Sequence, residues 1–158
     1  MDARAVHAAV GAVAAGFASD RKARQQRTTL DRADFDRLGD AGLRLVGLPA
    51  ARGGLWSDVA GSSRSICEIY RTLAGGDSSV ALVCSMHPAV LAFWLATETV
   101  DGDHAAAWTA QREAIFDTVE AGAWWGTITS EPGSGGDVAR TKAQAKPDGD
   151  GWRITGQK

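Results

Sequence analysis

The spacing of apolar residues changes at Trp124, and this change divides the chain into two parts of different structure. Before it, apolar residues recur every three or four positions, as on one face of a helix. After it, short β-rich runs are separated by glycine and proline, as in strands joined by turns. The sequence therefore predicts an α+β fold. An α-helical domain over residues 1–122 is followed by the first strands of an incomplete β domain over residues 123–158.

The helical part is predicted to contain about five helices and one short extended piece. Asp31 and Asp77 precede helical runs and can cap their first backbone N–H groups. Gly42 and Gly122 are suited to ending a helix. The predicted helices cover 5–26, 31–42, 58–74, 78–95 and a segment carrying Trp108, Ile115, Phe116 and Val119, and residues 43–54 form the extended piece.

The run from Ser78 to Leu95 is apolar on nearly every side, which predicts a central helix with neighbours on several sides. Met86, Phe93 and Trp94 are expected to serve helix packing rather than a ligand pocket. His87 in the same helix is expected to be a core histidine with satisfied hydrogen bonds.

After Trp124, three strands are predicted at 124–130, 141–146 and 151–155, with a turn over Pro147–Gly151. Trp124 and Trp125 would point to opposite faces of the first strand, so that one faces the core and the other a ligand or a neighbouring domain. Core packing is the favoured role of both.

Composition and charge restrict the class of protein. A net charge of -2 and a pI near 5.9 give no electrostatic reason to expect a nucleic-acid partner. No apolar run is expected to reach the roughly 18–20 residues that a membrane span needs. Cys67 and Cys84 lie in apolar helical segments, which predicts free buried thiols and a cytoplasmic location.

The stretch Glu131–Asp137 has three glycines in four positions. Glycine allows the backbone to approach a ligand, and successive N–H groups in such a turn can bind an anion. A dinucleotide fingerprint of the GxGxxG kind is excluded, because its third glycine would fall at Val138. The stretch therefore predicts either half of a cofactor site or a tight turn that binds nothing.

Two segments together resemble the acyl-CoA dehydrogenase family: "LRLVGLPAARGG" at 43–54 and "TSEPGSGGDVARTKAQAKPDGDGWRITGQK" at 129–158. The second is similar to the family's middle-domain signature, a hydroxyl and Glu-Pro-Gly loop followed by a hairpin that ends in Gly-x-Lys. The resemblance implies an FAD enzyme that removes hydrogens from Cα and Cβ of an acyl-CoA thioester. It also implies a helical domain, a central β-barrel and a C-terminal helical bundle around the flavin, so that residues 123–158 are the beginning of an incomplete β-barrel domain.

Carried over by position, the resemblance implies that Thr127, Thr129 and Ser130 lie along the flavin ring and that Ser130 hydrogen-bonds its polar edge. Gly135 and Gly136 would approach the FAD pyrophosphate and the bound thioester. Asp137 is expected to fix the loop rather than to touch substrate, and Glu131 to turn the chain out of the strand.

Two departures from the family pattern leave alternatives open. Gly136 stands where the family usually has serine, and Ser134 is offset by two positions. This favours a flavin-dependent monooxygenase of the same fold as an alternative. The family's next strand and its catalytic glutamate have no counterpart in this sequence, so no catalytic residue is assigned. The chain is expected to be inactive alone, as the N-terminal part of an enzyme completed by a homo-oligomer or a complementing chain, or as a non-catalytic truncated remnant.

Overall fold

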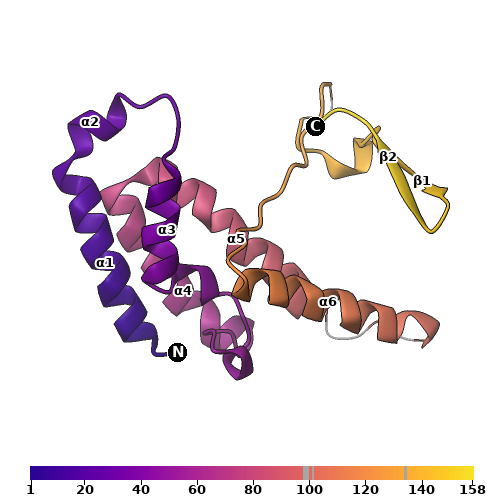
Figure 1. The fold of residues 1–158 in the computed structure, drawn as a ribbon, viewed down its shortest axis with the longest axis horizontal. Coiled ribbons are helices and arrows are strands. Elements are labelled where there is room, and N and C mark those ends of the chain that lie inside the picture. The colour runs from indigo at the N-terminus through magenta and orange to yellow at the C-terminus, as the bar shows by residue number, and fades with distance from the viewer. Residues whose placement is uncertain (98–99, 101, 134) are drawn as a thin grey trace. The chain divides into compact units, whose positions relative to one another are not determined.

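The computed structural model describes residues 1–97, 100, 102–133 and 135–158, which form two compact units, Met1–Gly126 and Thr127–Lys158. The first unit is helical and the second contains a β-hairpin (Figure 1). The described residues are thus mostly helical with one two-stranded antiparallel sheet, consistent with the α+β class. The change of unit lies four residues after the boundary predicted at 122/123.

Six α-helices are seen in the described residues: α1 (Ala3–Ser19), α2 (Arg21–Gln25), α3 (Arg32–Asp40), α4 (Val59–Gly76), α5 (Ser78–Ala96) and α6 (Ala105–Glu120). The 3-10 turns are η1 (Leu43–Leu45), η2 (Ala50–Arg52), η3 (Gly102–His104) and η4 (Val138–Arg140), and the strands are β1 (Gln144–Asp148) and β2 (Gly151–Thr155).

Aspartate side chains cap the N-termini of four of the helices. Asp31 accepts a hydrogen bond from the N–H of Ala33, and Asp77 accepts from Ser79 and Val80. These bonds satisfy backbone donors that have no partner within the helix. The predicted caps at Asp31 and Asp77 are confirmed, and Asp2 and Asp58 cap α1 and α4 in the same way.

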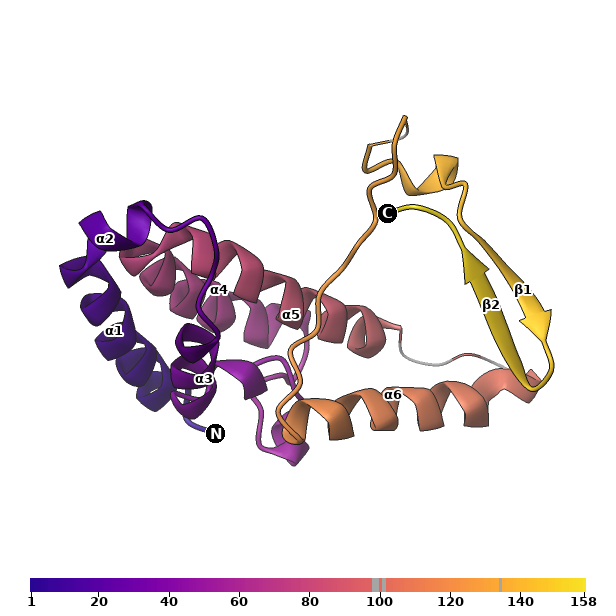
Figure 2. The ribbon, with the colours of Figure 1, turned by 45° about the horizontal axis from the view of Figure 1, so that its top comes forward.

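The core of the helical unit is formed by the inward faces of α1, α3, α4 and α5 (Figure 2). α1 packs along α4, and α4 packs along α5. A second group of buried residues joins the far half of α5 to α6. The two groups are Val6, Val10, Ala14, Phe17, Leu38, Leu43, Val46, Ile66, Ile69, Leu73, Val80, Ala81 and Cys84, and Leu48, Leu91, Phe116 and Val119.

A buried arginine connects α2 to α3 and to the start of α5. Arg24 donates to both carboxylate oxygens of Asp34, at 3.2 and 2.6 Å, and to Asp77 at 2.7 Å. Its guanidinium lies 3.8 Å from the centre of the Phe17 ring. Burial alone would raise the pKa of Asp34, but the hydrogen bonds from Arg24 and Arg37 outweigh it and lower that pKa. The basic run 21–27 therefore contains one buried residue, Arg24.

The backbone hydrogen bond that a proline removes from α5 is replaced by a hydrogen bond from a side chain of α4. Pro88 has no N–H, so the carbonyl of Cys84 loses its usual helical donor. The hydroxyl of Tyr70 donates to that carbonyl at 3.2 Å. Burial raises the pKa of Tyr70 well above its usual value, so this hydroxyl keeps its proton.

α5 is not surrounded on all sides, contrary to the prediction from its apolar composition. Leu82 and Phe93 are each 62% exposed and Val83 is 46% exposed, because α4 and the other helices cover only one face.

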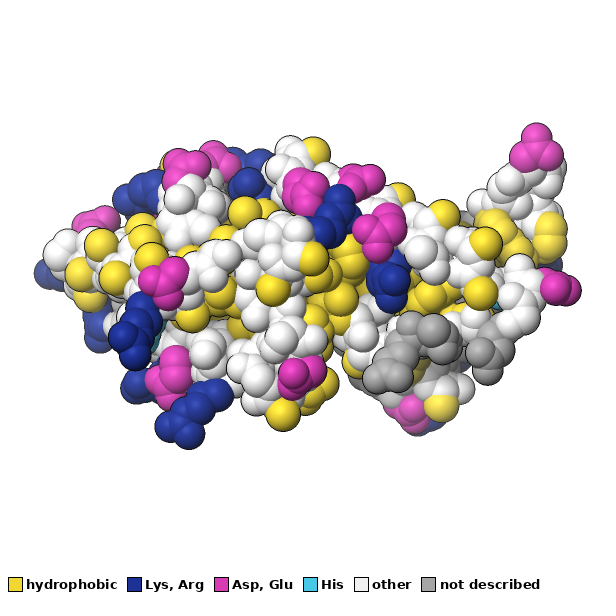
Figure 3. Space-filling view, turned by 90° about the horizontal axis from the view of Figure 1, so that it is seen from below, with side chains coloured by type: hydrophobic (Ala, Val, Ile, Leu, Met, Phe, Trp, Pro, Cys, Tyr) yellow, Lys and Arg dark blue, Asp and Glu magenta, His cyan; other side chains and the backbone are white. Residues whose placement is uncertain are grey.

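The expectation that no apolar run reaches membrane-spanning length was also wrong. α5 has 19 residues and contains an 18-residue stretch with a mean hydropathy of 1.7, a length and composition that core helices of soluble proteins can also have. On the face drawn in Figure 3, basic and acidic side chains lie beside one another.

Three predicted elements differ from the structure. The helix predicted over 5–26 is broken at Asp20, which ends α1 and precedes α2. Residues 43–54 form two 3-10 turns rather than an extended piece, with Leu43 and Val46 buried. Residues 124–130 form no strand, because no described strand lies beside them to pair with their backbone.

The hairpin of the second unit was predicted in outline. β1 and β2 pair antiparallel, with Ala145 opposite Ile154 and Pro147 opposite Trp152. β2 has the predicted bounds, whereas β1 covers residues 144–148 rather than 141–146, so Pro147 and Asp148 lie in the strand and not in the turn as predicted. All ten strand residues are exposed, so within the described residues this unit has no apolar core under its sheet.

Two adjacent glycines at the end of α4 give a matched test of helix packing. A Cβ at Gly76 would lie 2.4 Å from the carbonyl oxygen of Ala14 in α1, whereas a Cβ at Gly75 would meet nothing within 4 Å. We expect Gly76→Ala to lower the free energy of unfolding by about 1–3 kcal/mol through overpacking. Gly75→Ala should leave it unchanged or raise it by up to about 1 kcal/mol. Urea unfolding followed by circular dichroism measures both, and equal effects would contradict this packing.

Candidate functional site

The predicted cofactor loop is a closed turn in the second unit. Glu131 and Gly135 exchange two backbone hydrogen bonds, of 3.0 and 3.1 Å, so that the chain returns to its starting point within five residues. Gly133 and Gly135 have φ of +84° and +56°, values that favour glycine. The glycines are therefore required by the shape of the turn itself.

The side chain of Glu131 organises the whole second unit. One carboxylate oxygen accepts from the N–H of Lys142 at 2.6 Å, and the other accepts from the N–H of Ala143 at 3.1 Å and from the hydroxyl of Thr141 at 3.0 Å. The ammonium of Lys158 lies 2.8 Å from the carboxylate and also donates to the carbonyl of Thr129. One buried carboxylate thus joins the loop, the segment before β1 and residue 158.

These donors stabilise the charged form of Glu131. The hydrogen bond from Lys158 and the backbone N–H of Lys142 lower its pKa from 4.5 to about 2. Because the pKa is depressed in the folded chain, the stabilisation is fully present above pH 4.5 and is lost as the pH falls through about 2. Glu131 is ionised and fully engaged at neutral pH, so it is unsuited to take a proton from a substrate.

The five predicted cofactor-binding residues all lie in the second unit and are exposed: Thr127, Thr129, Ser130, Gly135 and Gly136. The predicted placement of Thr127, Thr129 and Ser130 on a strand is wrong, because residues 124–130 form no strand. The N–H of Gly135 is used within the loop, where it donates to Glu131. Ser134 lies outside the described residues.

The residues predicted to bind a flavin are open to solvent on this loop. The side chains of Thr129 and Ser130 are exposed hydroxyls, which can donate to the carbonyl and nitrogen edge of a flavin ring. A methyl group placed on Gly136 would meet no described atom within 4 Å, so a ligand can reach that backbone. The two hydroxyls and the backbone at Gly136 are thus accessible to a ligand.

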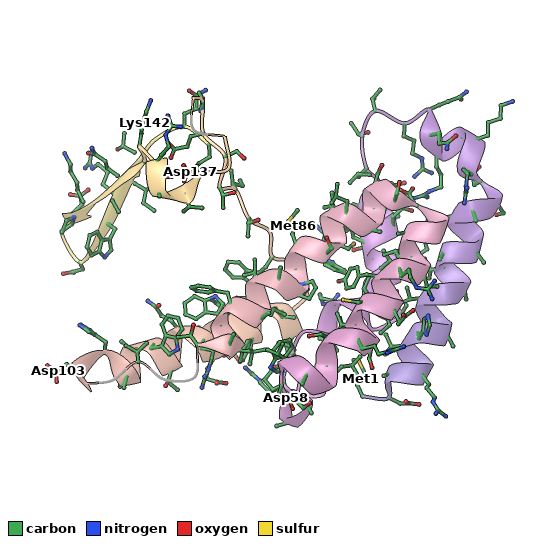
Figure 4. The ribbon with its side chains drawn as sticks, turned by 180° about the vertical axis from the view of Figure 1, so that it is seen from behind. Met1, Asp58, Met86, Asp103, Asp137 and Lys142 are labelled. Carbon is green, nitrogen blue, oxygen red and sulfur yellow. The ribbon has the colours of Figure 1, made fainter. Side chains whose placement is uncertain are left out.

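Asp137 and Lys158 hold the chain that follows the loop. Asp137 accepts from the N–H of Ala139 at 3.1 Å and begins η4, so it fixes the chain after the loop, as expected. Lys142 follows η4, and both side chains are labelled in Figure 4. Lys158 belongs to the predicted Gly-x-Lys ending, but its contact with Glu131 spans 27 positions and no local pattern indicates it.

The two tryptophans before this unit pack on the helices. Trp124 lies 6.0 Å from Phe35 and 5.1 Å from His87, measured between ring centres. The indole N–H of Trp125 donates to Thr118 at 2.9 Å. Core packing, the role favoured for both, is confirmed, and so is the prediction that His87 is a satisfied core histidine.

Other side chains that could bind a ligand or take part in catalysis are, among the described residues, either paired with one another or isolated. A cavity of about 470 Å³ lies in the helical unit, between the segment 21–30 and the residues 74–79. Three arginines line it. Arg24 is bound by Asp34 and Asp77, and Arg27 pairs with Asp20 and Asp34. Arg21 donates to the carbonyl of Gly75. Of the two cysteines, Cys84 is buried as predicted and Cys67 is exposed, and both are free. No cluster of potential metal ligands occurs among the described residues.

Comparisons with known proteins found no match among protein-family models, curated proteins or solved structures. The resemblance to acyl-CoA dehydrogenases therefore depends on the two sequence segments quoted above.

Replacing Glu131 tests whether it organises the second unit. Glu131→Gln removes the charge and one acceptor, so the N–H groups of Lys142 and Ala143 lose their charged partner. We expect hydrogen exchange at these two amides to become roughly tenfold faster. Asp150→Asn, at an exposed position of the hairpin turn in the same unit, should leave both rates unchanged. Unchanged exchange in the Glu131 variant would show that the carboxylate does not hold this unit together.

Proposed function

We propose that this chain is the N-terminal part of an FAD-dependent oxidoreductase similar to acyl-CoA dehydrogenases, acting on the Cα–Cβ bond of an acyl-CoA thioester. The observation that carries the proposal is the Glu-Pro-Gly loop. It is closed by its own backbone, held by a buried carboxylate, and followed by the hairpin and Gly-x-Lys ending of that family's signature. The exposed hydroxyls before it and the open backbone at Gly136 support a ligand on this loop.

In the proposed enzyme, Thr127, Thr129 and Ser130 bind the flavin ring, and Gly135 and Gly136 allow close approach of the FAD pyrophosphate. FAD would accept the hydride equivalent removed from the substrate. Hydrogen-bond donors at the edge of the ring favour the negative charge that develops there, which gives the Ser130 hydroxyl its role. Glu131 holds these residues in place without touching the substrate.

The proposal requires polypeptide beyond the residues described. Glu131 is engaged and its pKa is low, so the base that removes the α-proton would come from elsewhere. Exposed apolar side chains support coverage by further polypeptide. Leu82 and Phe93 on α5 are each 62% exposed, and Trp152 and Ile154 on β2 are 67% and 78% exposed. We propose a homo-oligomer or a complementing chain as the partner, in a reducing cytoplasm where Cys67 and Cys84 remain free.

Gly136 favours a second candidate of the same fold, a flavin-dependent monooxygenase. The hydroxyl that would contact the CoA arm or the phosphate is missing at this position. Such an enzyme would use the same flavin-binding hydroxyls, with oxygen as co-substrate and without recognition of CoA.

Titration of the isotope-labelled 158-residue chain with FAD tests the flavin site. We expect amide chemical-shift changes concentrated at Thr129, Ser130 and Gly136. Ser130→Ala should weaken binding about two- to tenfold, the effect of one lost hydrogen bond. Ser65→Ala, at an exposed position of α4, serves as the control and should bind FAD as the unaltered chain does. Shifts confined to the helical unit, or none at millimolar FAD, would contradict the proposed site.

The chain alone is expected to lack dehydrogenase activity, because no described side chain is placed to act as the base. The measurement is turnover of the purified chain with FAD, an acyl-CoA and an artificial electron acceptor. Turnover at the rate of an ordinary enzyme, about 10 per second, would show that the base is present within these residues.

A further inference from the structure

His87 joins three segments of the helical unit by means of its imidazole ring. The ring is fully buried in the middle of α5. Its Nε2 lies 2.8 Å from the carbonyl oxygen of Arg44, and its Nδ1 lies 2.8 Å from the backbone nitrogen of Trp125. One ring therefore connects α5 both to η1 and to the segment that follows α6.

These two partners determine the protonation state of the ring. A carbonyl oxygen only accepts, so Nε2 carries a proton and donates to Arg44. The N–H of Trp125 only donates, so Nδ1 accepts it and carries no proton. His87 is thus neutral in this structure. A second proton on Nδ1 would face the N–H of Trp125, and that hydrogen bond could not exist.

The bond to Trp125 lies where the chain leaves the helical unit. Trp125 precedes Gly126, the last residue of that unit. Its backbone is held by His87 and its indole by Thr118, while the neighbouring Trp124 ring packs on His87. The backbone bond to His87 is the only one of these three contacts that a single proton abolishes.

We propose that His87 is an acid-operated latch: the neutral imidazole holds the backbone of Trp125 to α5, and protonation of Nδ1 releases it while the helices stay folded. The change is local because Nε2 still donates to Arg44 in the protonated ring, so α5 and η1 remain joined. An imidazolium beside the indole of Trp124 is also favourable. Release therefore affects Trp125 and Gly126, where the chain leaves the unit.

The groups around the ring shift the pKa of His87 in the direction that this proposal requires. Burial lowers the pKa of His87, the hydrogen bond to the Arg44 carbonyl opposes this, and the positive charge of Arg44 lowers it further. Because the pKa is depressed in the folded state, the latch is fully closed above the ordinary histidine value of 6.5 and opens as the pH falls through the lower folded value.

The charged groups on the neighbouring elements are held by other partners. No carboxylate pairs with the ring among the described residues, so none stabilises its protonated form. The guanidinium of Arg44 in η1 donates to the carbonyl of Val119, and Asp34 of α3 is bound by Arg24, Arg27 and Arg37. The hydroxyl of Tyr70 in α4 donates to the carbonyl of Cys84 in α5. The carboxylates of α6 are all paired with Arg52: Glu113, Asp117 and Glu120.

The test combines two measurements on the intact chain between pH 8 and pH 4. Nitrogen NMR of the imidazole gives the protonation of His87, and hydrogen exchange gives the protection factor of the Trp125 amide. We expect the protection factor to begin to fall at the pH where His87 gains its proton, by about tenfold per pH unit as one proton is taken up. The core amides of Leu73 and Leu91 should keep their protection over this range.

Variants separate His87 from the other histidines. His87→Gln offers an acceptor that does not titrate, so Trp125 protection should become independent of pH. His7→Gln changes a histidine that pairs with Thr72 on another face and should keep the pH dependence of the unaltered chain. The proposal is overturned if His87 gains its proton without a change at Trp125, if His87 stays neutral until the helices unfold, or if the core amides lose protection together with Trp125.

Discussion

The helical unit depends on the pairing of one buried arginine. Arg24 reaches Asp34 on α3 and Asp77 before α5, and lies on the ring of Phe17 in α1. A buried guanidinium is tolerated only when charged partners replace the water it loses, and removing one partner typically costs about 3–5 kcal/mol. Asp77 also caps α5, so the same carboxylate sets where the longest helix begins. The positions of α2, α3 and α5 are therefore linked through electrostatics as well as through apolar packing.

The second unit depends on charge in a different way. Its two strands are exposed on both faces, and its segments are joined by the carboxylate of Glu131 rather than by apolar side chains. Hydrogen bonds to one ionised group can specify a loop in detail, but they bury little apolar surface. Such a unit has a well-defined local geometry with little stability of its own. This combination suits a binding loop whose final support comes from a ligand or a partner, as in the proposed flavoenzyme.

Sequence alone predicted the features that local chemistry decides. The caps at Asp31 and Asp77, the hairpin at 144–155 and a core role for His87 could be read from residue types and their spacing. Features that depend on distant residues could not. Strand preference at 124–130 led to no strand, because a strand needs a paired neighbour, and residues 43–54 were bent into 3-10 turns by burial of their leucines. At the candidate site, the loop was predictable, but the contact between Glu131 and Lys158 was not. The binding of FAD remains a prediction.

The bond from Tyr70 to the carbonyl that Pro88 leaves without a donor has a geometric consequence. A helix can slide along its neighbour by exchanging one apolar contact for the next, because such contacts are nearly equivalent from turn to turn. A hydroxyl directed at a single vacant acceptor has no equivalent one turn away. α4 and α5 are therefore locked in axial register, and proline, which usually disrupts a helix, here defines the position at which two helices meet.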